Sequence, residues 1–230
     1  MSAESGIPTF RGQGGFWREF RAEELATAEA FQRNPRLVWE SYMWRRDLVS
    51  KAAPNPGHFA LATLERAFDS FTVVTQNVDG LHRRAGSENL IEIHGNIMRS
   101  RCHDCGMLTE TTGLGEHRLP PSCASCGGPV RPDVVWFGEL LPRMALESAL
   151  EAATKAQVFL SVGTSSSVQP VSGLLGVAKK AGAFLLEINT EVTELSDQFD
   201  ETLRGPSGEI LPIICQELGL NISSPLAIAN

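Results

Sequence analysis

The sequence has no long hydrophobic run and little cysteine. None of its apolar stretches approaches the ~20 residues that a membrane-spanning helix needs, and no signal peptide opens the chain. Only five of the 230 residues are cysteines, and four of these form two close pairs. Such pairs fit metal binding in a reducing compartment better than a disulfide framework. We therefore expect no membrane partner and a cytoplasmic location.

The chain also has fewer basic than acidic residues. The chain has 20 Lys and Arg against 27 Asp and Glu, which gives a net charge of −7 and a pI near 5.3. Binding to a phosphate backbone depends on clustered basic residues, so we expect no nucleic-acid partner. A negative surface attracts lysine-rich segments, so basic protein partners are compatible with this composition.

Short β-branched runs alternate with helical stretches through most of the chain. A helical, charged region covers about residues 22–51, and Asn34-Pro35 interrupts it as a cap followed by a first helical residue. From residue 56 to 219 this alternation is typical of a parallel, doubly wound α/β sheet. The expected strands are residues 71–75, 90–93, 134–137, 158–162 and 184–188.

Polar side chains follow two of the expected strands directly. Gln76, Asn77 and Asp79 come after residues 71–75, and His94 comes after residues 90–93. Ligands bind beyond the carboxyl ends of the strands in open α/β sheets, which indicates a site here. The alternative is plain turn chemistry at Asn77–Gly80 and a strand end at His94.

The paired cysteines have the spacing of a structural zinc site. Cys102-x2-Cys105 and Cys123-x2-Cys126 are separated by 17 residues, which matches the four-cysteine zinc template. Four thiolates complete a closed tetrahedron, so this metal would stabilise structure without catalysing. A redox-active CxxC pair is the less favoured alternative. His103 and His117 are expected in loops, and the fifth cysteine, Cys215, is expected to pack in the core.

Several motifs together resemble one family. They are SAESGIPTFRG at residues 2–12, TQNVDGLHRRAG at 75–86, IEIHG at 91–95, VVWFGE at 134–139, GTSSSVQP at 163–170 and EINTE at 187–191. In this order, with the two cysteine pairs, they closely resemble the sirtuins, which are NAD-dependent protein deacylases. The resemblance covers nearly the whole chain.

The resemblance implies a Rossmann-like doubly wound parallel sheet with a small zinc-ribbon and helical module. The NAD-binding domain would comprise residues 1–20, 54–98 and 131–219. The small domain would comprise the helical module 21–53 and the zinc ribbon 99–130, with one structural Zn²⁺ per chain. Residues 220–230 would be a tail.

The resemblance also implies a mechanism, in which NAD and an acylated lysine give nicotinamide, the free lysine and O-acyl-ADP-ribose. His94 would be the general base, a role that suits an imidazole of near-neutral pKa. The implied cofactor-binding residues are Ser2, Ala3, Gly6, Phe10, Arg11, Gln76, Asn77, Val78, Asp79, Gly163, Thr164, Ser165, Asn189, Thr190, Glu191 and Ser207.

Tyr42 and Arg45 form a Tyr-x-x-Arg pair. This pair resembles the one that marks the sirtuin subgroup that removes succinyl and malonyl groups from lysine. An acyl carboxylate in an apolar tunnel needs a charged partner, and Arg45 with Tyr42 could supply it. Ala26 matches a small residue that leaves room for the longer chain. Spacing alone favours an amphipathic helix with a solvated Arg45 and a half-buried Tyr42. The substrate peptide would pair as a strand with Val135, Trp136, Phe137 and Gly138.

One departure from the family pattern concerns the N-terminus. The resemblance implies a strand and a GAG turn directly before Ser2, where the sequence has Met1. Such glycines let backbone N–H groups approach the pyrophosphate. We expect a start codon assigned too late; the alternative is a truncated, catalytically impaired acyl-lysine binding protein. A nicotinamide-dependent oxidoreductase is disfavoured because the chain has no G-x-G-x-x-G. Mono-ADP-ribosyl transfer stays open.

Overall fold

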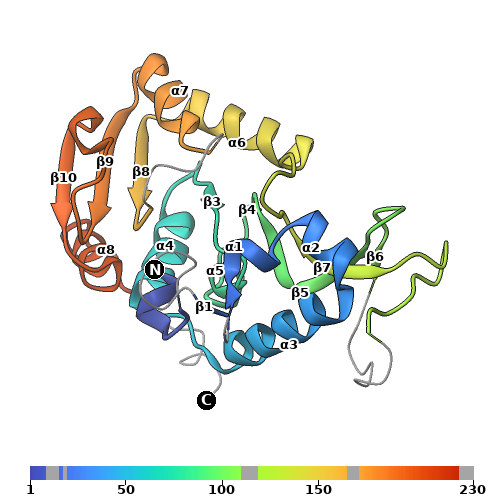
Figure 1. Cartoon of the computed structure of the whole chain (residues 1–230). Coiled ribbons are helices and arrows are strands. Elements are labelled where there is room, and N and C mark those ends of the chain that lie inside the picture. Colours follow the sequence, from blue (N-terminus) through green and yellow to red (C-terminus); the bar gives the residue numbers. More distant parts are fainter. Residues whose placement is uncertain (9–15, 18–19, 110–118, 165–170, 223–230) are drawn as a thin grey trace.

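The computed structural model describes residues 1–8, 16–17, 20–109, 119–164 and 171–222, and Figure 1 colours them along the chain. Phe10, Arg11, His117 and Ser165 lie outside the described residues. No helix in the described ranges combines the length and apolar character that a bilayer crossing requires.

Four of the five expected strands, at residues 71–75, 90–93, 158–162 and 184–188, form parallel sheets. β9 (Phe184–Asn189) lies between β8 (Val158–Val162) and β10 (Glu201–Arg204), and all three run in the same direction. β3 (Val73–Thr75) pairs in parallel with β4 (Leu90–Glu92). The parallel direction of these pairs confirms the predicted α/β class, and it brings the carboxyl ends of the strands to one edge.

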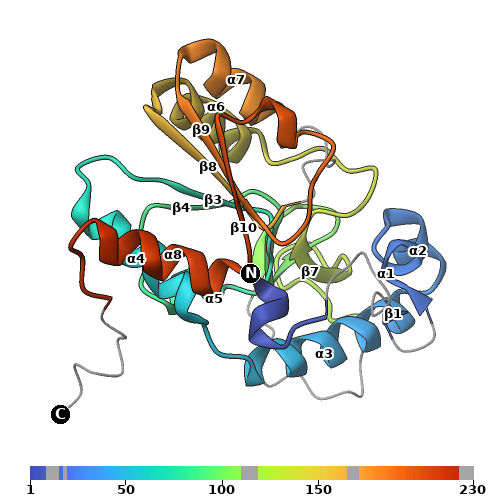
Figure 2. The same ribbon diagram turned by 90° about the vertical axis from the view of Figure 1, so that its left-hand side faces the viewer.

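Helices cover both faces of these strands, as Figure 2 shows. On one face, α6 (Arg143–Lys155) packs against α7 (Gly173–Ala181), and their apolar residues share a core with β9. On the other face, α4 (Pro56–Ala67) packs against α8 (Ser207–Glu217), and the core there includes the predicted packing residue Cys215, which is fully buried. The layers are those of a doubly wound fold.

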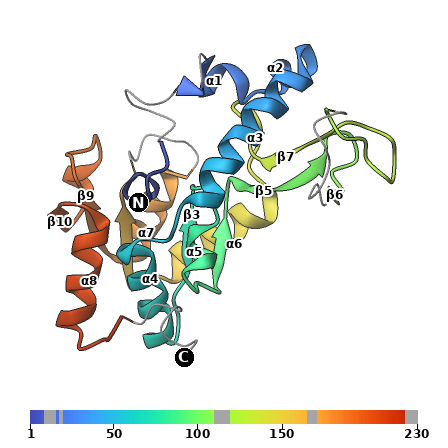
Figure 3. The same ribbon diagram turned by 90° about the horizontal axis from the view of Figure 1, so that it is seen from below.

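The helical region 22–51 is built from α1 (Ala22–Leu25), α2 (Ala28–Arg33) and α3 (Pro35–Lys51). α3 begins where the sequence predicts, because the Asn34 side chain accepts a hydrogen bond from the Leu37 N–H and Pro35 occupies the first turn. Figure 3 shows α3 running alongside the antiparallel strands of the ribbon.

The ribbon is a three-stranded antiparallel sheet in which β5 (Gly95–Cys102) lies between β6 (Leu108–Thr109) and β7 (Val130–Val134). Its buried residues share one core with the helical region, and the Trp39 indole donates a 2.6 Å hydrogen bond to the Val130 carbonyl. The smaller elements are η1 (Ser2–Ser5), β1 (Phe16–Trp17), β2 (Phe20–Arg21), α5 (Leu81–Arg84) and η2 (Ser196–Gln198).

The strand expected over residues 134–137 is wrong in its position. β7 ends at Val134, and beyond it only Phe137 forms an isolated bridge, with Thr27. The Trp136 backbone N–H donates to the Glu139 carboxylate, and the Glu139 N–H donates back to the Trp136 carbonyl at 3.0 Å. These local bonds fold residues 136–139 into a tight turn, which uses groups that a continuing strand would need.

Candidate active site

His94 lies at the carboxyl end of β4, between the parallel sheet and the ribbon. β4 ends at Glu92, and a turn through Ile93 leads to His94, whose Nδ1 lies 3.1 Å from the Gln76 carbonyl oxygen. That carbonyl can only accept, so Nδ1 carries the proton and Nε2 is the basic nitrogen. Burial lowers the pKa of His94, although the bond to Gln76 opposes this shift. The imidazole is therefore neutral at pH 7, as a general base requires.

Gly95 makes this position of His94 possible. Its φ is +80°, and a Cβ at Gly95 would lie 2.2 Å from the Asp133 carbonyl oxygen. Any side chain would therefore push β5 away from β7. The close approach also lets the Val135 N–H donate to the His94 carbonyl at 2.9 Å, which fixes the histidine backbone.

The predicted cofactor residues near β3 come together with the N-terminal turn. The Ser2 hydroxyl donates to the Asp79 Oδ2 at 2.5 Å, and the Asp79 Oδ1 accepts from the Leu81 N–H at 2.9 Å. Across the rim, the Gln76 amide donates to the Thr164 hydroxyl at 3.3 Å, and the Asn189 amide donates to the Thr164 carbonyl at 2.9 Å. The ends of β3, β8 and β9 thus meet.

A cavity of about 1030 Å³ opens at this rim. Its lining includes, among the predicted site residues, Ser2, Arg45, Gln76, Asn77, Val78, Asp79, Gly163 and Thr164. His94 is not in that lining, nor are the predicted adenosine residues Asn189, Thr190, Glu191 and Ser207. The amide, hydroxyl and carboxylate groups in the lining suit a polar dinucleotide.

The remaining predicted cofactor residues have local structural contacts. Ala3 lies in η1, and Gly6 caps it in a left-handed conformation. The Glu4 carboxylate accepts hydrogen bonds from the Ser207 hydroxyl and the Gly208 N–H, both at 2.6 Å. This ties η1 to the first turn of α8, where a carboxylate is favoured.

The predicted acyl-pocket residues Tyr42 and Arg45 are both buried on α3, so the solvated Arg45 and half-buried Tyr42 expected from spacing are wrong. Arg45 is 4% exposed, lines the cavity and donates from Nη2 to the Pro8 carbonyl at 3.0 Å. Burial lowers its pKa, while Tyr42 and Asp79 favour its charge. A buried guanidinium beside a cavity is suited to an anionic group.

Tyr42 links the acyl-pocket helix to the predicted peptide edge. Its hydroxyl accepts a 2.9 Å hydrogen bond from the indole N–H of Trp136, and burial raises the pKa of the phenol. The same segment contacts Ala26, whose carbonyl accepts from the Phe137 N–H at 2.9 Å. The pocket residues and residues 135–138 therefore form one connected wall.

Arg131 and Glu139 fix this wall, and sequence reasoning did not identify this function for either. The Arg131 side chain is 2% exposed; it pairs with both Glu139 oxygens, donates to the Val134 carbonyl at 2.7 Å and lies 3.2 Å from the Trp136 ring centroid. We call these two residues the Arg131–Glu139 clamp. An arginine between Val130 and Pro132 in β7 was the available signal, since a buried charge requires a partner.

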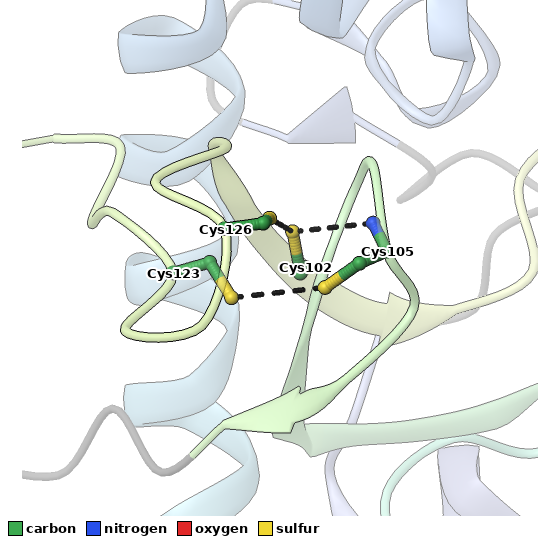
Figure 4. Close-up of side chains that lie close together, drawn as sticks. All are labelled: Cys102, Cys105, Cys123 and Cys126. Atoms are coloured by element: carbon green, nitrogen blue, oxygen red, sulfur yellow. Dashed lines mark hydrogen bonds between the residues drawn. The ribbon is translucent and has the colours of Figure 1, made fainter.

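The four paired cysteines meet at one end of the ribbon (Figure 4). Their sulfurs all lie within 4.8 Å of one another, and two pairs are separated by 3.4 and 3.8 Å. Zn–S bonds of about 2.3 Å in a tetrahedron give sulfur separations of about 3.8 Å, so the cluster fits one structural zinc. Although the Gly128 N–H lowers the pKa of Cys126, the neighbouring sulfurs raise it to about 12. A bound cation would stabilise the deprotonated sulfurs and so oppose this rise in the pKa of Cys126.

The chain has clear relatives. The model of the Sir2 family matches residues 1–170. The chain belongs to the Sir2 family. An NAD-dependent protein deacylase of Leptospira interrogans is 49% identical to this sirtuin over 219 residues, which cover 95% of this chain and 89% of the relative. An NAD-dependent protein deacylase of Aquifex aeolicus is 54% identical over 198 residues, covering 85% and 82%.

Solved structures share the fold of this sirtuin. A Sir2 homologue in complex with NAD has a TM-score of 0.89 at 43% identity, covering 95% of this chain and 85% of that one. A mutant Sir2 homologue with 2′-O-acetyl ADP ribose also has a TM-score of 0.89 at 43% identity, covering 95% and 88%. A Sir2 mutant with a deacetylated p53 peptide and 3′-O-acetyl ADP ribose has a TM-score of 0.83 at 30% identity, covering 96% and 90%.

Proposed function

We propose that this sirtuin is an NAD-dependent protein-lysine deacylase that takes acylated-lysine proteins as partners. The observation that carries the proposal is the neutral His94 imidazole, fixed by the Gln76 carbonyl at the rim where Asn77 and Asp79 line the cavity. The names of the relatives and the ligands of the similar structures support it. They also favour turnover over the alternative of an acyl-lysine binding protein without activity.

When bound, NAD supplies the bond to nicotinamide that is broken in the reaction. Asn77 and Asp79 would hold the nicotinamide end, since both line the cavity and Asp79 is fixed by Ser2. His94 would accept a ribose hydroxyl proton at Nε2, because Nδ1 is committed to Gln76. Gly163, Thr164, Asn189 and the other residues predicted above would contact the rest of the dinucleotide.

The direct test follows each product. The protein is incubated with NAD and an acyl-lysine peptide, and nicotinamide, free lysine peptide and O-acyl-ADP-ribose are quantified. We expect equal amounts of the three and no NADH. Formation of NADH, or peptide binding without nicotinamide release, would contradict the proposal.

We further propose that succinyl- and malonyl-lysine are preferred over acetyl-lysine. Arg45 is buried, and its guanidinium is at the cavity lined by Asp79 and Val78. A dicarboxylic acyl chain would bring a carboxylate into this space, where an unpaired charge is costly and a guanidinium can bind it with two hydrogen bonds. An acetyl group has no carboxylate, so it would form no such charged pair with the Arg45 guanidinium.

Replacement of Arg45 by methionine tests the preference. A hydrogen bond to a charged group contributes roughly 1.5–3 kcal/mol, so kcat/KM for a succinyl peptide should fall about 10- to 150-fold, with a smaller change for the acetyl peptide. Arg36→Met is the matched control, because Arg36 lies on the same helix but is exposed and pairs only locally with Glu40. Equal kcat/KM for the two peptides in the unaltered protein would refute the preference.

We also propose that the substrate peptide adds a strand along residues 135–138. The NAD-binding domain and the small domain would have the boundaries expected from the sequence, and the protein would be cytoplasmic. A strand and glycine turn ahead of Ser2 would strengthen NAD binding. Comparing the NAD affinity of this chain with one extended upstream by ~20 residues measures that contribution.

A further inference from the structure

Strand β5 carries a bulge near the catalytic rim. Asn96 lies opposite Asp133 of β7, and Ser100 lies opposite Pro132, so residues 97–99 are inserted between consecutive positions of β7. Because proline has no N–H to donate, it is found in sheets mainly at edges and bulges. We call residues 97–99 the β5 bulge. Inserted residues are not satisfied by the ladder, so their backbone groups require other partners.

Arg46 of α3 supplies partners for two carbonyls of the β5 bulge. Its Nε donates to the Ile97 carbonyl at 2.6 Å, and its Nη2 donates to the Arg99 carbonyl at 2.7 Å. Nη2 also donates to the Ser100 hydroxyl at 2.9 Å, and the guanidinium lies 5.1 Å from the centroid of the Trp39 ring. Burial lowers the pKa of Arg46 to about 10, so the group is still charged at pH 7. A planar guanidinium can direct several donors at once in a fixed fork, which spans the bulge here.

The β5 bulge in turn holds a segment of the rim. Ile97 is fully buried, and its N–H donates to the Val78 carbonyl at 2.8 Å. Val78 lies between Asn77 and Asp79, the two cavity residues that we assign to the nicotinamide end of NAD. β5 also begins directly after His94. A displacement of the Ile97 peptide would therefore reach both the nicotinamide end and the base.

Arg46 and its neighbour Arg45 serve different parts of the site. Successive residues of an α-helix point about 100° apart. Arg45 lines the cavity and donates to the Pro8 carbonyl, whereas Arg46 is outside that lining and donates to the ribbon. One residue of α3 thus faces the proposed acyl pocket, and the next holds the β5 bulge.

A second set of contacts fixes the exposed side of the bulge. Arg99 pairs with Glu92 at 2.6 Å and with Asp133 at 3.0 Å, which joins the bulge to β4 and β7. These ion pairs do not involve Arg46, so they should preserve the register of the ribbon when Arg46 is replaced. We therefore expect variants at Arg46 to fold, with only the buried backbone of the bulge released.

We propose that Arg46 is a positioning residue for the deacylase reaction, because its guanidinium fixes the β5 bulge and the bulge fixes Val78 between Asn77 and Asp79. The inference rests on the proposed function and adds to it a residue outside the cavity, which acts through the backbone of Ile97. The nicotinamide end of NAD is the same for every acyl substrate. Loss of Arg46 should therefore slow the reaction by the same factor whatever the acyl group.

Two variants of the full chain test this. Arg46→Met removes the fork and keeps an apolar stem, and Arg46→Lys keeps the charge but offers a single point donor. Arg36→Met is the matched control, because Arg36 lies on the same helix, is exposed and pairs with Glu40 one turn away. For each protein we would measure hydrogen exchange of the Ile97 amide by NMR without ligands, the thermal midpoint, and kcat and KM with succinyl and acetyl peptides.

We expect Arg46→Met to speed exchange of the Ile97 amide by roughly tenfold or more. It should lower kcat by about tenfold or more with both peptides, so that the ratio of succinyl to acetyl activity stays unchanged. Arg46→Lys should show both effects in smaller degree, because one ammonium cannot bond to both carbonyls in the same geometry, and Arg36→Met should show neither.

A fall in the thermal midpoint of Arg46→Met with unchanged Ile97 exchange and unchanged kcat would overturn the proposal, since the role would then be stability alone. A loss of activity confined to the succinyl peptide would also overturn it, because Arg46 would then belong to the acyl pocket. If Arg46→Met does not fold, the same criteria apply to Arg46→Lys. Failure of the proposed function is recognised separately, as an unaltered protein that releases no nicotinamide with either peptide, and Ile97 exchange still decides whether Arg46 holds the bulge.

Discussion

The Arg131–Glu139 clamp makes a strong quantitative prediction. Glu139→Gln removes the negative charge that faces Arg131, a side chain only 2% exposed. Breaking a buried pair from one side costs about 3–5 kcal/mol, and because Glu139 is 22% exposed we expect the lower part, about 3 kcal/mol. For a chain of this length each kcal/mol shifts the thermal midpoint by roughly 2–4 °C, so a fall of about 6–12 °C should follow.

The clamp should also control substrate binding. Trp136 donates its indole N–H to Tyr42 and its backbone N–H to Glu139, so loosening the clamp displaces the proposed peptide edge and one wall of the acyl pocket together. We expect KM for an acyl peptide to rise more than kcat falls, because the His94 imidazole is bonded to the Gln76 carbonyl, which lies outside the clamp. Calorimetry and steady-state kinetics on the same preparation measure both effects.

Glu147→Gln is the matched control. Glu147 is half-exposed and pairs with Arg143 one helical turn away, an arrangement that contributes at most about 0.5 kcal/mol. If Glu139→Gln lowers the thermal midpoint no more than Glu147→Gln does, the clamp is not a stabilising buried pair and the reasoning fails.

Three further predictions concern the base and the metal. His94→Tyr should abolish turnover while zinc content and thermal midpoint stay unchanged; residual activity would remove His94 from its role. Burial holds the pKa of His94 below 6.5, so the base stays neutral until the pH falls through that lowered value. The acid limb of the pH profile of kcat/KM should therefore lie below pH 6.5. An acid limb above pH 6.5 would contradict this prediction. Cys123→Ser should release about one zinc per chain and unfold the ribbon, as metal analysis and circular dichroism would show; a folded ribbon without metal would refute the structural role.

Much of the fold could be predicted because its signals are local. The cap at Asn34 and the proline after it define the start of α3, and short, mainly apolar runs define β8 and β9. The zinc cluster follows from spacing alone. α4 begins at Pro56, because the Asn55 side chain caps it and the His58 Nδ1 accepts a hydrogen bond from the Asn55 N–H.

The parts that escaped prediction depend on contacts between distant residues. β7 stops at Val134 because of the turn held by Glu139, and no propensity of the run VVWF reveals this. Arg45 is buried because the segment at Pro8 and the helix α3 meet, 37 positions apart in sequence. The division of the parallel strands into two sheets is likewise a property of pairing, which composition and periodicity do not determine.

One strand connects the metal cluster to the catalytic rim. β5 begins at Gly95, the residue after His94, and ends at Cys102, a distance of at most about 23 Å for seven steps of roughly 3.3 Å. Oxidation of the cysteines or removal of the zinc ion would therefore release the Cys102 end of the strand that begins directly after His94. A zinc ion with no open coordination position, which never contacts substrate, would in this way make turnover sensitive to the redox state and zinc supply of the cell.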